Sequence, residues 1–266
     1  NFKASMPQGI KLWNDVTPHL YQLKVTIRDK KKIYDTREIE FGFREVTTSK
    51  SKILINGKPV FLRGNLDCVH FPLTGYPSCK VEDWEKIFRI YKDYGLNHVR
   101  FHSWCPPEAA FNVADRMGFY IQVELPLWTL NVGEDKSTVD FLYNEAAHIM
   151  KEYGNHPSFC FWSLGNELQG DFSVMDKLLT TIKQQDSRHL YMTTTFTFEP
   201  GHGSWPEPND DFWVTQWTKN GWVRGQGIFD DQPVSFNKDF SSAIEGLPVP
   251  LITHEIGQYS VFPNLK

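Results

Sequence analysis

The chain has 266 residues, of which 40% are hydrophobic, so it is long enough to bury the core of one large domain. Its 28 basic and 32 acidic residues give a net charge of −4, which disfavours nucleic acid or an anionic lipid surface as a partner. The sequence contains no run of about 18 apolar residues, so no membrane-spanning helix is expected.

The first 47 residues are predicted to form β-strands. Residues 20–27 alternate between apolar and polar side chains, as in a half-buried strand, and residues 33–46 are strand-like again after a charged turn. Two strands alone cannot close a hydrophobic core. We therefore predict that 1–47 is the last part of a β-sandwich.

From residue 48 onward, short apolar runs alternate with helical segments. Seven strands are predicted, at 60–64, 97–102, 119–124, 158–164, 190–195, 212–216 and 251–255. Helices are predicted at 82–94, 107–117, 139–153 and 171–185, with a weaker one near 235–245. This alternation favours an α/β fold, a (β/α)₈ TIM barrel over 48–266 that lacks its last unit. The alternative is an open doubly wound sheet, which is disfavoured because no glycine-rich phosphate turn follows any strand.

Polar and aromatic residues recur where the predicted strands end. In a barrel, the carboxyl ends of the strands meet at one face, which is where active sites lie. The candidates in chain order are Arg63, Asp67, His102, Trp104, Glu124, Trp128, Asn166, Glu167, Gln216, Trp217, His254 and Glu255. The sequence has nine Trp, and aromatic rings often serve as platforms for sugars, so this face is a candidate carbohydrate site.

Glu167 and Glu255 follow strands four and seven, which lie on opposite sides of a barrel. Hydrolysis of a glycosidic bond usually requires two carboxyl groups, about 5–5.5 Å apart when the enzyme retains configuration. A neighbouring carboxylate raises the pKa of the one that acts as the acid. Glu124 is a third candidate, and the residues alone do not rank it below the other two.

Other chemistries have weaker support. His102 could donate to a substrate hydroxyl or carboxylate, or it could only support its neighbours. Glu124, His102 and His254 could be drawn as metal ligands, but nothing in their spacing requires a metal. The four cysteines form no Cys-x-x-Cys pair, and no Gly-x-Ser-x-Gly turn of a serine hydrolase is present.

With these motifs, the chain resembles glycoside hydrolase family 2, the β-galactosidase, β-glucuronidase and β-mannosidase family of clan A. The most specific match is Asn-His-Pro-Ser at 155–158 followed by Trp-Ser-Leu-Gly-Asn-Glu at 162–167. Phe-Gly-Phe-Arg at 41–44 and the segment 55–64 resemble the family's entry into its barrel. The resemblance makes 1–47 the C-terminal part of an immunoglobulin-like β-sandwich domain.

The resemblance also implies roles for individual residues. Glu167 would be the general acid/base, and Asn166 would bind the sugar 2-hydroxyl. Glu255 would be the nucleophile, with Arg63 close to it, and Glu124 would be a binding carboxylate. No organic cofactor is expected.

Some positions depart from the family pattern. Arg-Gly-Asn-Leu-Asp-Cys at 63–68 stands where β-galactosidases have Arg-Gly-Val-Asn-Arg-His, and His-Ser-Trp-Cys-Pro at 102–106 replaces the family's Ser-His-Tyr-Pro. These changes leave the general mechanism in place but leave the identity of the sugar open.

The sequence therefore predicts a retaining exo-β-glycosidase, β-galactosidase-like, acting on terminal β-linked sugars. We expect it to be part of a secreted or periplasmic multidomain protein whose remaining domains contact this chain. A non-catalytic carbohydrate-binding homologue and a retaining endo-glycanase of the same clan are the alternatives.

Overall fold

A parallel five-stranded sheet lies at the centre of the computed structural model, which describes residues 8–224, 237 and 239–256. Its strands are β6 (Gly64–Asp67), β7 (His98–Phe101), β8 (Tyr120–Glu124), β9 (Phe159–Ser163) and β10 (Leu190–Met192). They pair side by side in chain order, and every pairing is parallel. All the carboxyl ends of these strands therefore point to one edge.

Four helices connect these strands in turn. They are α1 (Val81–Asp93), α2 (Glu108–Met117), α3 (Lys136–Tyr153) and α4 (Phe172–Gln185), as predicted to within three residues at each end. Asp135 and Asp171 cap α3 and α4 by accepting hydrogen bonds from first-turn N–H groups. The apolar faces of the helices bury one face of the sheet, around Trp84, Phe88 and Phe101.

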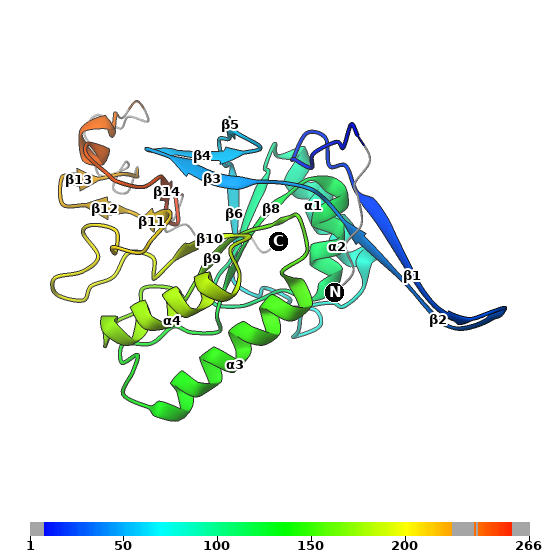
Figure 1. The fold of residues 1–266 in the computed structure, drawn as a ribbon. Helices are drawn as coiled ribbons and strands as arrows, with labels where there is room; N and C mark the ends of the chain where they lie inside the picture. The colour runs from blue at the N-terminus through cyan, green and yellow to red at the C-terminus, as the bar shows by residue number, and fades with distance from the viewer. Residues whose placement is uncertain (1–7, 225–236, 238, 257–266) are drawn as a thin grey trace.

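Two further parallel strands follow the five-stranded sheet in the barrel. β11 (Trp213–Thr215) pairs with β14 (Leu251–Thr253) as a separate two-stranded sheet. Single hydrogen bonds tie this sheet to the β10 side: Phe196 N donates to Val214 O at 3.0 Å, and Asp211 N donates to Tyr191 O at 2.8 Å. The described residues thus contain the seven predicted parallel strands of a TIM-barrel fold (Figure 1).

A small antiparallel sheet lies at the amino ends of the barrel strands. It consists of β3 (Val46–Ser49), β4 (Lys52–Ile55) and β5 (Lys58–Pro59). Trp13 is fully buried here, its Nε1 donates to Asp115 O at 2.8 Å, and its ring meets Tyr120 edge to face. The side chain of Arg44 donates to the carbonyls of Pro157, Phe159 and Arg188, which ties the N-terminal segment to β9 and β10.

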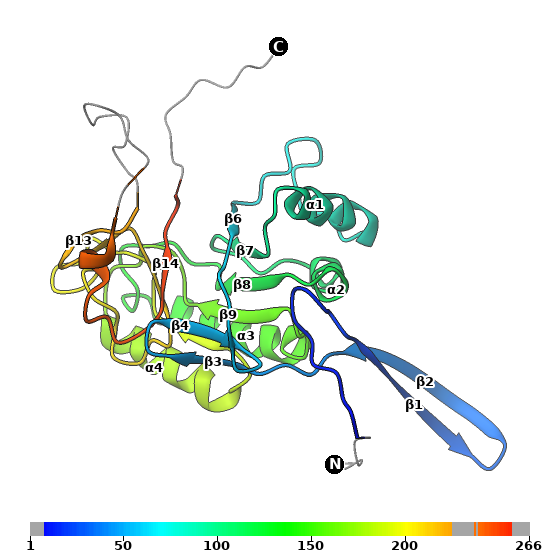
Figure 2. The same ribbon diagram turned by 90° about the horizontal axis from the view of Figure 1, so that it is seen from above.

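The N-terminal hairpin projects from this body (Figures 1 and 2). Its strands β1 (Tyr21–Asp29) and β2 (Lys32–Phe41) are antiparallel, and nearly all their side chains are exposed. Arg116 of α2 bonds Glu40 at 2.8 Å and so connects the hairpin to the barrel. A hairpin was predicted here, and its assignment to a β-sandwich domain over 1–47 stays a prediction.

Two predicted elements differ from the observed ones. The first barrel strand was placed at 60–64 but begins at Gly64, where a Cβ would lie 2.6 Å from His98 Nδ1, so a larger residue would not fit this close approach. The weak helix near 235–245 is observed only as a 3₁₀ turn, Ser241–Ile244, and residues 235, 236 and 238 of that range lie outside the described residues.

Two short strands, β12 (Trp217–Thr218) and β13 (Gly221–Trp222), form a hairpin directly after β11. A membrane-spanning helix is not found in the described part of the chain: none of its helices combines the necessary length and apolar character.

Trp13 should be a major source of stability for the amino-end face. Trp13→Ala removes a fully buried indole and should lower the free energy of unfolding by about 3–5 kcal/mol. Urea denaturation measures this change. The matched control is Leu12→Ala, because Leu12 is exposed and should change the free energy by less than about 1 kcal/mol; similar losses in both variants would contradict the interpretation.

Candidate active site

The side-chain amide of Asn166 is the centre of a hydrogen-bond network at the carboxyl edge. Its Oδ1 atom lies 2.6 Å from Arg100 Nη2, 3.1 Å from Thr195 Oγ1 and 3.2 Å from His254 Nε2. Because arginine only donates, the atom facing it must be the amide oxygen. No described residue accepts a hydrogen bond from Asn166 Nδ2, which remains a donor for a ligand.

Arg100 and Glu124 form a buried ion pair beside this amide. Arg100 Nε donates to Glu124 Oε1 at 2.7 Å, and the two side chains are 6% and 0% exposed. Ser163 Oγ and the main-chain amide of Ser103 also donate to the carboxylate, at 2.9 and 2.7 Å. Burial opposes ionisation, but the charge and hydrogen bonds of Arg100, with the Ser103 amide, hold the pKa of Glu124 below its usual value.

Glu167 occupies a left-handed backbone conformation, with φ of +48°, directly after Asn166. Thr195 holds this turn, since its Oγ1 accepts the Glu167 amide at 2.8 Å while it donates to Asn166. Thr194 Oγ1 accepts the next amide, that of Leu168, at 2.9 Å. The consecutive threonines after β10 therefore fix the turn that presents Glu167.

Glu255 has the same left-handed φ, +48°, after β14. Its Oε1 lies 3.2 Å from His254 Nε2. Burial lowers the pKa of His254, so this imidazole is neutral at neutral pH and acts on Glu255 as an N–H donor. Arg224 Nη1 donates to the carbonyls of both His254 and Glu255, at 2.8 Å each.

The two carboxyl groups have opposite shifts. Burial and then the negative charge of Glu255 raise the pKa of Glu167, while Arg100 and Arg224 oppose that rise. The hydrogen bond from His254, assisted by the positive groups Arg100 and His102 and opposed by burial, lowers the pKa of Glu255 to about 2. At neutral pH, Glu255 is therefore a carboxylate, and Glu167 is the carboxyl group better able to carry a proton.

Several other predicted residues reach this edge. His102 is close enough to Glu124 and Glu255 to contribute to the lowered pKa of both carboxyl groups, and its ring centroid lies 6.2 Å from that of Trp128. Trp128 is 65% exposed. Trp217 is also partly exposed and packs edge to face on Trp222 of the same hairpin, with ring centroids 5.5 Å apart.

Trp104 does not offer an open sugar platform. Its indole packs on Phe101, with centroids 5.0 Å apart, and on Trp84 in the core between sheet and helices.

Arg63 and Asp67 are not brought into the network. Arg63 lies at the amino end of β6, where its Nε donates to Gly95 O at 2.6 Å, so it is not close to Glu255 as expected. Asp67 is the last residue of β6, and it lies on the side of the strand that faces α1. Burial and then the negative charge of Asp67 raise the pKa of Tyr91, a residue of α1, to about 12. Because side chains alternate along a strand, Cys68 faces the site instead, and Glu255, Arg100 and Glu124 all influence its pKa.

The arginine beside the carboxylates is Arg100, which the sequence analysis missed. Its signal was available: Arg100 lies two residues before His102, on the same face of the same strand. Arg224 was also missed, and it carries no comparable signal because it follows a short hairpin outside any motif.

A metal centre finds no support in the described ranges, since they hold no group of three or more His, Cys, Asp or Glu side chains placed to bind an ion. The four cysteines, all in described positions, are free thiols.

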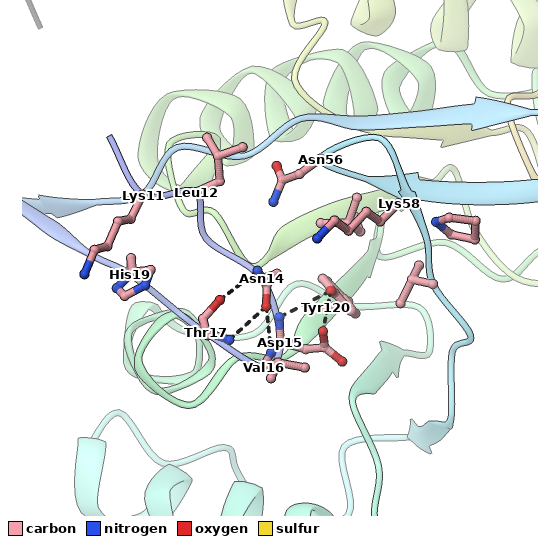
Figure 3. A pocket seen from close by; sticks show the side chains of 13 residues that line it. Lys11, Leu12, Asn14, Asp15, Val16, Thr17, His19, Asn56, Lys58 and Tyr120 are labelled. Carbon is pink, nitrogen blue, oxygen red and sulfur yellow. Dashed lines mark hydrogen bonds between the residues drawn. The ribbon is translucent and has the colours of Figure 1, made fainter. Parts of the chain in front are cut away.

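A pocket of about 610 Å³ lies at the opposite end of the barrel, away from this network (Figure 3). It is bounded by the segment around Asn14 and Asp15, the β4–β5 turn and Tyr120, the first residue of β8. There Tyr120 OH donates to Asp15 Oδ1 at 2.8 Å. The contacts around this pocket hold the N-terminal segment to the barrel. The residues that line it do not include two acidic side chains that could act as a catalytic pair.

A TIM-barrel fold with two carboxyl groups of opposite pKa shift at the carboxyl edge of its strands is an arrangement that suits a glycoside hydrolase. A family model described as "Glycosyl hydrolases family 2, TIM barrel domain" matches residues 46–197, more than half of the chain. A second model, "Glycosyl hydrolases family 2", matches residues 3–44. The chain belongs to glycosyl hydrolase family 2.

Curated relatives carry two different activity names. The chain is 27% identical to a β-galactosidase of Lactococcus lactis subsp. lactis, over 59% of this chain and 16% of that protein. It is 30% identical to a putative β-glucuronidase of Formosa agariphila, over 68% and 18%, and 29% identical to the β-galactosidase large subunit of Latilactobacillus sakei, over 70% and 32%. The chain thus spans about a sixth to a third of the length of these relatives.

Solved structures show the same fold. A β-glucuronidase from Ruminococcus gnavus in complex with D-glucaro 1,5-lactone matches with a TM-score of 0.72 and 22% identity, over 91% of this chain and 43% of that one. A β-glucuronidase from Parabacteroides merdae with glycerol in its active site gives a TM-score of 0.69 and 21% identity, over 84% and 28%.

The ion pair of Glu124 should be required for stability. Glu124→Gln leaves Arg100 without its charged partner and should lower the free energy of unfolding by about 3–5 kcal/mol at neutral pH. Because the folded-state pKa of Glu124 is lowered, its contribution is full above the unfolded pKa of about 4.3 and is lost as pH falls through the folded value.

Urea denaturation at several pH values checks this prediction, and the difference from wild type should shrink in acid. Glu152→Gln on the exposed face of α3 is the control, with an expected change below about 1 kcal/mol. A neutral-pH loss no larger than that of the control would contradict the stabilising role of the pair.

The coupling between Glu167 and Glu255 can be measured directly. Glu255→Gln removes the negative charge that raises the pKa of Glu167, so that pKa should fall. NMR titration of ¹³C-labelled glutamate carboxyls follows it, with Glu152→Gln again as control. An unchanged Glu167 titration would mean that the two groups do not sense each other.

Proposed function

We propose that this chain carries the catalytic centre of a retaining exo-β-glycosidase that removes terminal β-linked sugars. The observation that carries the proposal is the opposite shift of two carboxyl groups at one edge: Glu167 raised and Glu255 lowered to about 2. A proton donor beside a carboxylate is what double displacement requires. Family membership and relatives named β-galactosidase and β-glucuronidase support it.

In the first step, a Glu255 carboxylate oxygen attacks the anomeric carbon while Glu167 gives its proton to the glycosidic oxygen. The bond from that carbon to the oxygen breaks, the leaving group departs as an alcohol, and the sugar is esterified to Glu255. In the second step, Glu167 takes a proton from water, whose oxygen displaces Glu255. Two inversions at one carbon give net retention.

The buried network would prepare both groups. Glu255 must be ionised to attack, and the His254 hydrogen bond with the positive charge of Arg100 favours that form. Glu167 must hold a proton, and burial beside Glu255 favours that form. As a glycosyl ester forms on Glu255, its negative charge disappears, so the pKa of Glu167 falls and the group becomes the base of the second step.

Substrate contacts follow from what the network leaves open. We assign Asn166 Nδ2 as the donor to a sugar hydroxyl, because its Oδ1 is already used by three donors. His102 and Cys68 would line the same sugar site, and Trp128 and Trp217 would offer exposed aromatic faces at its rim. An aryl-glycoside panel (galactoside, glucuronide, mannoside and glucoside) on the full-length protein identifies the sugar.

Two variants of the full-length protein separate the roles. Glu167→Gln should slow hydrolysis of poor leaving groups by about 100-fold or more, but should slow an activated dinitrophenyl glycoside much less, because that leaving group needs no proton. Glu255→Gly, which suits the left-handed backbone, should abolish turnover. Steady-state kinetics measures both effects.

Added azide should occupy the space left by Glu255→Gly and yield a glycosyl azide of inverted configuration, detected by NMR. Glu152→Gln should keep wild-type rates. Wild-type activity in either site variant, or an equal loss on both leaving groups in Glu167→Gln, would refute the assignment.

A further inference from the structure

The nucleophile assigned above, Glu255, sits beyond the last regular hydrogen bond of its strand. β14 ends at Thr253, and the ladder with β11 gives one more bond, from His254 N to Thr215 O at 2.8 Å. The next residue turns into the left-handed region, with φ of +48°. A non-glycine residue in that region needs neighbouring groups to hold it.

The side chain of Arg224 supplies such a contact. Its Nη1 atom donates to the main-chain carbonyls of His254 and Glu255, at 2.8 Å each. These two carbonyls lie immediately before and immediately after the Cα atom of Glu255, at the point where the backbone turns. Arg224 is 4% exposed, so these bonds form away from bulk water, where they are stronger. The guanidinium therefore fixes the backbone on which the Glu255 carboxylate is mounted.

Arg224 is itself placed by the tryptophan hairpin. The hairpin β12–β13 leaves β11 at Gln216 and returns at Val223, whose amide donates to Gln216 O at 3.0 Å. Arg224 is the next residue, so closure of the hairpin brings its side chain under the β14 end. The exposed aromatic rim and the support of Glu255 are thus parts of one element.

The charge of Arg224 also acts on both carboxyl groups. Burial lowers the pKa of Arg224, but the charges of Glu255 and Glu167 oppose that shift, and in return Arg224 lowers the pKa of Glu167. The other titratable or charged groups that act on Glu167 are Glu255 and Arg100, and those that act on Glu255 are His254, Arg100 and His102. Cys68 also feels Glu255, Arg100, Asp67 and Glu124.

We propose that Arg224 is a positioning residue for the glycosidase reaction: it holds the Glu255 turn through two main-chain carbonyls and places a positive charge near both Glu255 and Glu167. The proposal rests on the proposed function, because it assigns Arg224 to the support of that nucleophile and that acid. Arg224 does not touch the sugar in this assignment. Thr195 holds Glu167 in the corresponding way, as an uncharged counterpart.

Two substitutions test the charge and the geometry separately. Arg224→Gln removes the charge that lowers the pKa of Glu167, so that pKa should rise. Arg224→Lys keeps the charge on a shorter side chain with a single nitrogen, so that pKa should stay close to wild type while the hold on the two carbonyls weakens. Titration of ¹³C-labelled Glu167 by NMR in the full-length protein measures the shift without requiring turnover.

Kinetics gives the second readout. In both variants kcat should fall, by about tenfold or more in Arg224→Gln, while KM changes little, since no sugar contact is lost. The basic limb of the kcat/KM pH profile should move upward only in Arg224→Gln. Arg116→Gln, an exposed arginine paired with Glu40 far from the site, is the control and should leave both readouts unchanged.

The possible results separate this inference from the proposed function. If the wild-type protein cleaves no glycoside, the proposed function fails, while the Glu167 titration still decides whether Arg224 sets its ionisation. If the wild type is active and Arg224→Gln keeps both its kcat and its Glu167 titration, the inference is overturned. If Arg224→Gln does not fold, Arg224→Lys decides: a raised Glu167 pKa or an unchanged kcat overturns the proposal.

Discussion

The site depends on a single amide oxygen, Asn166 Oδ1, which three side chains from different strands and loops share. Arg100, Thr195 and His254 all converge on it, from the ends of β7, β10 and β14. Each of these donors also contacts a carboxyl residue, namely Glu124, Glu167 and Glu255. Because Asn166 and its three donors are buried, a displacement of one strand end would leave several polar groups unsatisfied. The network therefore holds the carboxyl end of β14 next to the carboxyl ends of β7 and β10, although these strands belong to two separate sheets.

The sequence predicted the strand order well, because it follows from local pattern, while the catalytic roles of Glu167 and Glu255 stay predictions. Short apolar runs that alternate with helical segments located the seven strands, and Asn166-Glu167 and Glu255 stood out as polar groups ending such runs. What it could not supply was the direction of each side chain at the first strand. A shift of the strand start from 60 to Gly64 moved Arg63 to the wrong end, and the two-residue period turned Asp67 towards α1.

Long-range placement was the other limit. Arg224 contacts the Glu255 backbone only because the β12–β13 hairpin closes and brings Arg224 to the end of β14, about 30 residues later in the chain. No periodic pattern in the sequence predicts such a contact. Trp104 shows the reverse case: it follows a strand end as expected, yet the core between sheet and helices offered its indole a more apolar environment than the edge. An aromatic residue that follows a strand can thus lie either at the exposed carboxyl edge or in the core between sheet and helices. Which of the two it occupies depends on packing that the sequence alone does not reveal.

The left-handed conformation shared by Glu167 and Glu255 links activity to a cost in folding. For a residue with a Cβ, this conformation is disfavoured by about 1–2 kcal/mol relative to the right-handed one, whereas glycine and asparagine adopt it readily. Under the proposed function, hydrolysis therefore requires a glutamate at two positions where glycine or asparagine would be less strained. Replacement of either glutamate by glycine or asparagine would relieve this cost. Under the same proposal, a variant with glycine at both positions would be a more stable protein that no longer cleaves sugars.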